Sequence, residues 1–137
     1  QIDYYKNRFL KYINPGFIKC VTDEKDELVA FAITMPSFSN ALKKIKGKVD
    51  LIGKLRLLHA KNFNSKGSLY LIGVRPDFQN KGVIAILFNE LQKFYNKFGI
   101  TEVETNPELI ENTAIQQLWK NYENNQHKNR ATFTKQI

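Results

Sequence analysis

Residues Ser68–Phe88 read SLYLIGVRPDFQNKGVIAILF, and this stretch carries the clearest evidence for the fold of the chain. Its first part, Leu69–Val74, is a run of apolar and β-branched residues, which is typical of a strand buried on both faces. Pro76 ends the run, because proline cannot donate to a strand ladder and restricts the residue before it. From Val83 onward, apolar residues recur at helical spacing as far as Phe98. The stretch therefore predicts a strand, a tight turn and a helix.

The predicted turn has the features of an anion-binding site. It reads Gln79, Asn80, Lys81 and Gly82, and the first turn of the helix that follows carries no acidic residue. The first four amides of a helix have no partner inside it, and the positive end of the helix dipole lies there. Lys81 adds a mobile positive charge beside these amides. We therefore expect an anion to bind at this turn.

Residues 74–83, V-R-P-D-F-Q-N-K-G-V, resemble the cofactor motif of the GNAT acyltransferases, where Gln or Arg, two residues, Gly, one residue, then Gly or Ala follow a strand. Gln79 and Gly82 match this motif, whereas Ile84 stands where the family has Gly or Ala. The resemblance implies that the loop amides hold the pyrophosphate of acetyl-CoA or another acyl-CoA, and that the strand pairs with its pantetheine arm. The residues it implies for this role are Leu71, Ile72, Gly73, Val74, Gln79, Asn80, Lys81, Gly82, Val83 and Ile84.

Length and composition restrict the class of protein. The 137 residues suffice for one domain, and the 42% hydrophobic content favours a folded globule. Cys20 is the only cysteine, which excludes an internal disulfide and favours a reducing compartment, so we expect a cytoplasmic protein. No apolar run approaches the roughly 18 residues that cross a bilayer.

The formal net charge of +8 is concentrated in one segment, because residues 40–61 hold seven basic residues against Asp50 alone. Such a segment suits phosphate groups, whether of CoA, nucleic acid or an anionic membrane surface, and equally a solvated helix face. Apolar residues between the lysines predict a helical insertion at about 40–63, which Gly47 and Gly53 divide or kink. Its apolar stripe is expected to pack on this domain or on an upstream part of the protein.

Patterning elsewhere predicts an α/β (α+β) fold. Charged residues 23–27 separate two apolar runs, which indicates an antiparallel hairpin. Gly99 is expected to end the helix that starts at Val83, and Asn106 with Pro107 to start the next helix. The remaining predicted elements are a helix at 3–13, strands at 17–22 and 28–35, a strand at 100–105, a helix from 107 that carries Tyr122, and a strand at 131–137.

Further stretches extend the resemblance over nearly the whole chain. MPSFSNALKK, ETNPELIENTAIQQLWKNY and the tail 126–130 look like the C-terminal half of a group of longer, uncharacterised bacterial GNAT-like proteins. This implies one GNAT-like domain over 1–137, a fragment of a longer protein whose upstream N-terminal half is a partner. It also implies a mixed, mostly antiparallel twisted sheet flanked by helices, without the family's first strand and helix.

The resemblance also suggests catalytic residues. Many GNAT enzymes protonate the leaving thiolate with a tyrosine seven residues after an asparagine, and that count from Asn112 reaches Trp119, so Tyr122 is the available phenol and Asn112 is assigned to the cofactor. Carboxylates deprotonate amines and attract cationic acceptors, which favours Glu104, with Asn106 beside it, where acceptor amines enter. Glu108 is alternatively a partner of the helix dipole, and the two aromatic residues are alternatively core residues.

Other chemistries find little support. His59 and His127 are far apart, and with one cysteine they offer no metal-ligand spacing, so no metal is expected. Three functions stay open: an acyltransferase acting on a small-molecule or peptide amine, a non-catalytic GNAT-like module, and, less favoured, nucleic-acid binding through the insertion. The last lacks the interleaved aromatic residues of single-strand platforms. Whether the chain is an enzyme is therefore left open.

Overall fold

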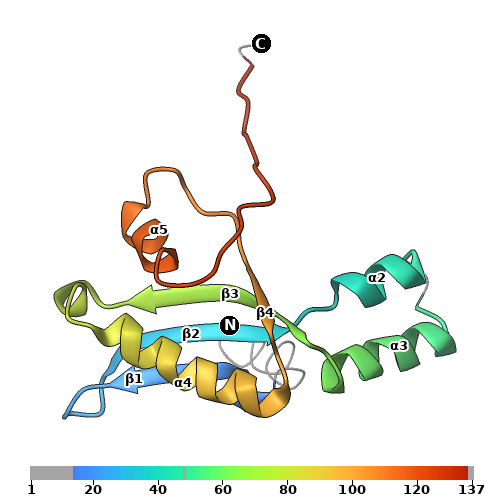
Figure 1. Ribbon diagram of the computed structural model, residues 1–137, viewed down its shortest axis with the longest axis horizontal. Helices are drawn as coiled ribbons and strands as arrows, with labels where there is room; N and C mark the ends of the chain where they lie inside the picture. The colour runs from blue at the N-terminus through green and yellow to red at the C-terminus, as the bar shows by residue number, and fades with distance from the viewer. Residues whose placement is uncertain (1–13, 48, 136–137) are drawn as a thin grey trace. The chain divides into compact units, whose positions relative to one another are not determined.

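The computed structural model describes residues 14–47 and 49–135. The chain divides into two compact units, Gln1–Thr105 and Asn106–Ile137, which we describe one at a time. The predicted helix at 3–13 lies outside the described residues. The elements, labelled as in Figure 1, are η2 (Pro15–Phe17), β1 (Ile18–Thr22), β2 (Leu28–Pro36), α2 (Ser39–Ile45), α3 (Leu51–Asn62), β3 (Lys66–Val74), η3 (Pro76–Phe78), α4 (Val83–Phe98), β4 (Glu102–Thr105) and α5 (Thr113–Trp119).

In the first unit the described strands form one sheet in the order β1-β2-β3-β4. The β1–β2 and β2–β3 pairs are antiparallel and the β3–β4 pair is parallel, so the predicted mixed, mostly antiparallel sheet is confirmed. The predicted hairpin is also present, and its turn is held by Asp23, whose Oδ1 accepts the amides of Lys25 (2.9 Å) and Glu27 (3.0 Å). Asp26 adopts the left-handed conformation (φ 64°) that this turn requires.

The core of this unit lies between the sheet and α4, which contacts β1 and β2 (Figure 1). Val83, Leu87 and Leu91 recur at four-residue spacing, so they share one face of α4, and all three are buried. The opposing strand β2 contributes small buried side chains, including Ala30 and Ala32. The apolar period read from the sequence therefore describes α4 correctly, and Gly99 ends the helix in the left-handed conformation as predicted.

The prediction that strand β3 is buried on both faces is wrong for its second half. The side chains of Tyr70 and Leu71 are 41% and 58% exposed. The partner strand β4 pairs only with Lys66 to Leu69, so β3 continues beyond it as a sheet edge. An apolar run does not distinguish a central strand from a strand that leaves the sheet partway along.

The basic insertion is helical, as predicted, but it is divided only once. Gly47 (φ 79°) lies in the link between α2 and α3, whereas Gly53 lies inside α3. Asp50 explains the difference, because its side chain caps α3 by accepting the Gly53 amide (2.7 Å). Of the stripe expected to pack on this domain, only Ile45 is buried; Leu42, Val49, Ile52, Leu55 and Leu58 are exposed.

In the second unit the helix begins later than predicted. The Asn112 side chain caps α5, so Asn106 and Pro107 do not start this helix. Between Pro107 and Asn112 the chain turns. The Gln116 side-chain amide donates to the carbonyls of Leu109 (3.2 Å) and Ile110 (3.0 Å), which satisfies these groups without a helix. The strand predicted at 131–137 is also wrong: residues 131–135 have no regular structure, and 136–137 lie outside the described residues.

Candidate functional site

The candidate site lies in the first unit, where β3 passes through η3 into α4. The β3–β4 ladder runs from the Lys66–Glu102 pair to the Leu69–Thr105 pair. Beyond Leu69, within the described residues, β3 pairs only with β2. At this point Tyr70 is an extra residue opposite β2, because the register changes between the pairs of Leu69 and Leu71. The bulge and the end of β4 together leave one edge of residues 71–74 without a strand partner among the described residues of this unit.

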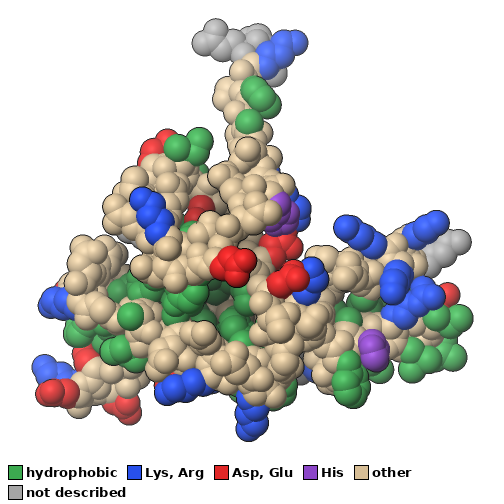
Figure 2. All heavy atoms as spheres, viewed as in Figure 1, with side chains coloured by type: hydrophobic (Ala, Val, Ile, Leu, Met, Phe, Trp, Pro, Cys, Tyr) green, Lys and Arg blue, Asp and Glu red, His purple; other side chains and the backbone are tan. Residues whose placement is uncertain are grey.

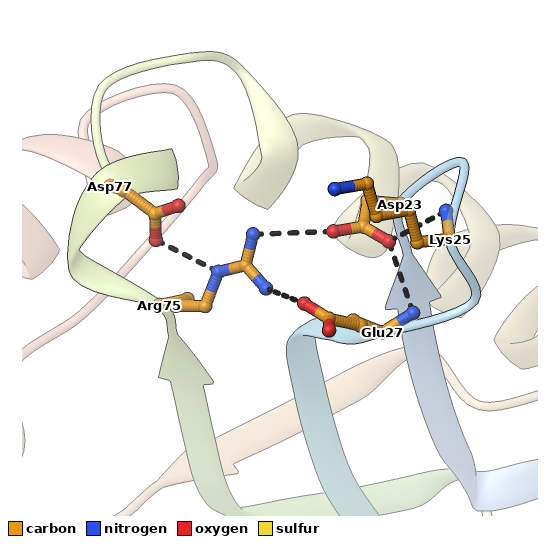
Figure 3. A network of polar contacts seen from close by, with 5 residues as sticks. All are labelled: Asp23, Lys25, Glu27, Arg75 and Asp77. Carbon is orange, nitrogen blue, oxygen red and sulfur yellow. Dashed lines mark hydrogen bonds and ion pairs between the residues drawn. The ribbon is translucent and has the colours of Figure 1, made fainter.

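Arg75 holds the chain after β3 against the β1–β2 turn (Figure 3). Its guanidinium donates to Asp77 (2.8 Å), Glu27 (3.2 Å) and Asp23 (3.3 Å), and its backbone amide donates to the Val29 carbonyl (2.8 Å). The Asp77 hydrogen bond is the main cause that raises the pKa of Arg75 above its ordinary value. The amide of Glu27, followed by smaller contributions that include Arg75, holds the pKa of Asp23 below its ordinary value. Arg75 therefore links the β1–β2 turn to η3 through ion pairs.

The ring of Phe78, at the end of η3, lies beside two positively charged side chains. The Arg75 guanidinium lies 4.5 Å from the ring centroid, and the Lys81 Nζ lies 5.3 Å from it. These distances are within the range of cation–π attraction, which is weak at an exposed site. The contacts hold two cations beside the start of α4.

The start of α4 presents free backbone donors. Gly82 caps the helix with φ 76°, and its carbonyl accepts the amides of Ala85 (3.0 Å) and Ile86 (3.3 Å). No side chain caps this end, and the first turn has no acidic residue. Residues 79–82 form a turn, and among the described residues the amides of Val83 and Ile84 have no side-chain hydrogen-bond partner. No atom lies within 4 Å of the position that a Cβ at Gly82 would take, so the space beside these donors is open.

The residues predicted for the cofactor thus follow one another around a single turn, from Leu71–Val74 on β3 to Gln79–Ile84 at the start of α4. Gln79 is partly committed to the turn itself, because its side-chain amide lies 3.5 Å from the Val74 carbonyl. Lys81 is exposed and Ile84 is half-buried. Their assignment to a cofactor stays a prediction.

The predicted catalytic residues fall in both units. Glu104 lies on β4, half-buried and in register with Ser68, whereas Glu102 on the same strand pairs with Lys66. Asn106, Asn112 and Tyr122 belong to the second unit. Asn112 acts there as the cap of α5, with Ile115 N at 3.5 Å.

Trp119 has a partner that sequence reasoning missed. Its Nε1 donates to Glu108 Oε1 (2.7 Å), and its ring meets the Tyr122 ring edge-on at 6.3 Å. Glu108 precedes α5, so it does not occupy the first turn of that helix as predicted. The spacing of eleven residues between the two side chains carries no local signal for this pair.

The histidines and acidic residues of the described chain do not form a metal site. Within residues 14–47 and 49–135, no group of three or more His, Cys, Asp and Glu side chains is placed to hold a metal ion. His59 is exposed on α3 and stacks on Phe63 (5.3 Å), and His127 is exposed in the segment after α5. No helix in the described part of the chain is long and apolar enough to cross a membrane.

The fold agrees with comparisons to known proteins. A model described as the acetyltransferase (GNAT) family matches residues 3–122. The chain therefore belongs to the GNAT acetyltransferase family, whose acyl donor is acyl-CoA. No curated protein sequence matches it.

Solved structures show the same fold at low sequence identity. The aminoglycoside N-acetyltransferase AAC(6')-Iy in complex with CoA is 16% identical, with a TM-score of 0.53 over 88% of this chain and 75% of that chain. The aminoglycoside 6'-N-acetyltransferase AAC(6')-IG from Acinetobacter haemolyticus is 13% identical, with a TM-score of 0.58 over 100% and 83% of the two chains. A putative phosphinothricin N-acetyltransferase is 13% identical, with a TM-score of 0.58 over 86% and 61%.

Proposed function

We propose that the chain is an N-acyltransferase domain that binds acetyl-CoA or another acyl-CoA and transfers the acyl group to an amine. The observation that carries the proposal is the start of α4, where no described side chain caps the helix, the first turn has no acidic residue and the space at Gly82 is open. Free amides at a helix start bind phosphate well, because the helix dipole favours negative charge there. Lys81 contributes a mobile positive charge to the same anion.

The edge of β3 supplies the second half of the proposed donor site. Residues 71–74 lack a second strand partner among the described residues of this unit, so their backbone groups are suited to pair with the amides of an extended pantetheine arm. The bulge at Tyr70 would then mark the end of the arm near the thioester. The thioester supplies the activated acyl group, and the residues of the chain bind and orient it.

Proton transfer is assigned to residues near the carboxyl end of β4 and after it. Glu104 is proposed to take a proton from the acceptor amine, with Asn106 orienting that amine. Tyr122 is proposed to donate a proton to the departing thiolate, and Asn112 to assist in holding the donor. Trp119 is unsuited to protonating the thiolate, because an indole N–H is a hydrogen-bond donor and not a practical acid.

Several further properties belong to this proposal. The acceptor would be a small-molecule or peptide amine, and the protein would be cytoplasmic. The whole of 1–137 would act as one GNAT-like domain with a basic insertion, as a fragment of a longer protein whose N-terminal half lies upstream.

Calorimetric titration with acetyl-CoA tests the donor site. We expect heat of binding that Lys81→Ala weakens about two- to fivefold, the range that one exposed charge contributes. Lys97→Ala is the matched control, because Lys97 is an exposed lysine in the last turn of the same helix. Ile84→Ala, which restores the residue usual in the family, should tighten binding if the isoleucine crowds the phosphates. Absence of heat at millimolar acetyl-CoA would refute the donor site.

A second candidate function is a non-catalytic acyl-CoA-binding module. It is favoured by the hydrogen bond between Trp119 and Glu108, since the residue that stands at the family's tyrosine position is committed to a carboxylate. Tyr122→Phe separates the two functions: an enzyme should lose about 10²- to 10⁴-fold in turnover while keeping its affinity for acetyl-CoA. Trp119→Tyr should raise hydrolysis of acetyl-CoA if the site lacks only its acid. Bound donor without turnover in either variant would favour the non-catalytic module.

A further inference from the structure

The basic insertion exposes an apolar stripe that its own packing does not use. Leu51, Leu55 and Leu58 on α3 are 75%, 59% and 56% exposed, and their spacing places them on one side of the helix. Ile52 and Phe63 extend the stripe, with 59% and 73% of their surfaces exposed. Isolated apolar residues are common on protein surfaces, but a continuous row on one helix indicates an interaction surface.

The insertion holds its shape through other residues. Ala41 and Ile45 are the buried side chains of α2, and Gly53 is the buried residue of α3. Asp50 caps α3, and the Arg56 Nη1 donates to the Lys44 carbonyl (3.3 Å), which ties the two helices together. Because these contacts leave Leu51, Leu55 and Leu58 in solvent, the stripe is available to another surface.

Positive charge lies beside this stripe. Lys54 and Lys61 each follow a stripe leucine by three positions, so they lie along its border. Figure 2 shows blue basic side chains gathered over α2 and green apolar side chains over α3. Asp50 is the one acidic residue of the insertion, and its carboxylate is engaged in capping. The described basic residues of the insertion are Lys43, Lys44, Lys46, Lys54, Arg56 and Lys61.

We propose that this insertion docks the protein on an anionic lipid surface, with Leu51, Leu55 and Leu58 in the interface and the lysines at the headgroup phosphates. Binding of a helix to such an interface grows with the apolar area it buries and with the attraction of its basic side chains to anionic lipids. Anionic lipids attract clustered lysines, and the acyl boundary covers the leucines, so both properties of the surface are used together. Nucleic acid would neutralise the lysines but leave the leucines in water. A protein partner is less suited, since the centres of protein interfaces are depleted in lysine.

The test is co-sedimentation of the 137-residue chain with large vesicles, comparing phosphatidylcholine alone with phosphatidylcholine that contains 30% phosphatidylglycerol. We expect binding to the anionic vesicles only, and a loss of binding as salt rises from 0.1 to 1 M, since the screening length then falls from about 10 to about 3 Å. The double variant Leu55→Ser, Leu58→Ser should bind about tenfold more weakly. Ile86→Ser is the matched control, because Ile86 is an apolar residue on α4 with 57% exposure and lies outside the insertion.

Each alternative occupant gives a different result. Failure to bind anionic vesicles, or equal binding to neutral ones, would overturn the proposal. If the double variant still binds in a salt-sensitive way, only the lysines are attracted to the vesicles and the proposal is overturned. Equal binding to an oligonucleotide would then identify general phosphate binding. Concentration-dependent dimerisation that the double variant abolishes, without vesicle binding, would assign the stripe to a second copy. The exposed substitutions should leave the thermal unfolding midpoint nearly unchanged, which excludes unfolding as the cause.

Discussion

Removing one oxygen atom from the core should stabilise the protein. Tyr95 lies on α4, and its hydroxyl is buried without a hydrogen-bond partner among the described residues. The neighbouring Thr34 hydroxyl donates instead to the Phe17 carbonyl (2.8 Å). In the unfolded chain the Tyr95 hydroxyl bonds to water, so folding removes a hydrogen bond and does not replace it. Tyr95→Phe should therefore remove this penalty.

The size of the gain follows from the cost of an unpaired buried hydroxyl. That cost is about 1–3 kcal/mol, and the aromatic ring, with its packing, is unchanged by the substitution. For a chain of this length, 1 kcal/mol corresponds to a shift of roughly 3–5 °C in the thermal midpoint. We therefore expect Tyr95→Phe to raise the midpoint by about 3–15 °C at pH 7.

Alkaline pH provides an independent test. Burial raises the pKa of Tyr95 above its ordinary value of 10.0, and the Thr34 hydroxyl, which lies near the phenol but outside hydrogen-bonding geometry, offsets part of the rise. Below pH 10 the phenol is protonated in the folded and unfolded states alike, so its stability contribution does not vary with pH. Above pH 10.0 the unfolded chain loses the proton first, which lowers the free energy of unfolding as pH rises towards the folded pKa. The difference in stability between Tyr95→Phe and the natural chain should therefore grow from pH 9 to pH 11.

Urea and thermal unfolding followed by circular dichroism measure both effects. Thr34→Val is the opposing control: Thr34 is fully buried and its hydroxyl is bonded, so its removal leaves the Phe17 carbonyl unpaired and should cost about 1–3 kcal/mol. Two neighbouring hydroxyl deletions are thus expected to have opposite signs. A loss of more than about 1 kcal/mol in Tyr95→Phe would show that the hydroxyl has a partner and would refute the reasoning.

Three further substitutions test local interactions. Asp50→Ala should lower the free energy of unfolding by about 1 kcal/mol in urea titrations and reduce the helical circular dichroism signal, because it removes the cap of α3. Gly82→Ala should cost about 1–2 kcal/mol through its positive φ alone, since a Cβ there meets no atom within 4 Å; a larger loss in the same titration would contradict this. The pKa of Asp23 is lowered mainly by the hydrogen bond from the Glu27 amide and to a smaller extent by Arg75, so the stabilisation from this carboxylate is present above pH 3.8 and is lost as pH falls below that value. Arg75→Gln should reduce part of this acid dependence below pH 3.8 in thermal melts, and an unchanged acid limb would refute the contribution of Arg75.

Local signals explain why the central part of the fold was predictable. Pro76 and Gly82 each limit the backbone at the place where the sequence predicts a break, and the apolar period from Val83 defines the buried face of α4. The β1–β2 hairpin is similarly local, because Asp23 accepts hydrogen bonds from residues two and four positions later. In these segments the residues that determine the conformation are neighbours in the sequence.

The errors have a different physical origin. The end of β4 at Thr105 leaves Tyr70 and Leu71 exposed, and nothing within β3 itself encodes the length of its partner. A strand at 131–137 would require a partner strand, which residues 131–135 lack in the described structure. The Trp119–Glu108 hydrogen bond joins two residues that the sequence patterns treat separately, Trp119 at the position of the family's acid and Glu108 as a partner of the helix dipole. Each of these features depends on contacts between segments and not on composition or period.

The position of the basic insertion relative to β3 leads to a final prediction. The insertion enters β3 at Lys66, and the turn proposed to bind the pyrophosphate leaves it after Val74. Nine strand residues separate these points by roughly 25 Å at about 3.3 Å per residue. A helix docked in the headgroup region would therefore leave the turn well outside the lipid, open to a water-soluble acyl-CoA. We expect the affinity for acetyl-CoA, measured by equilibrium dialysis, to be the same with and without anionic vesicles, with phosphatidylcholine vesicles as the control. Competition between vesicles and acetyl-CoA would show instead that both ligands bind the same lysines. It would refute the argument that the length of β3 keeps the two sites apart.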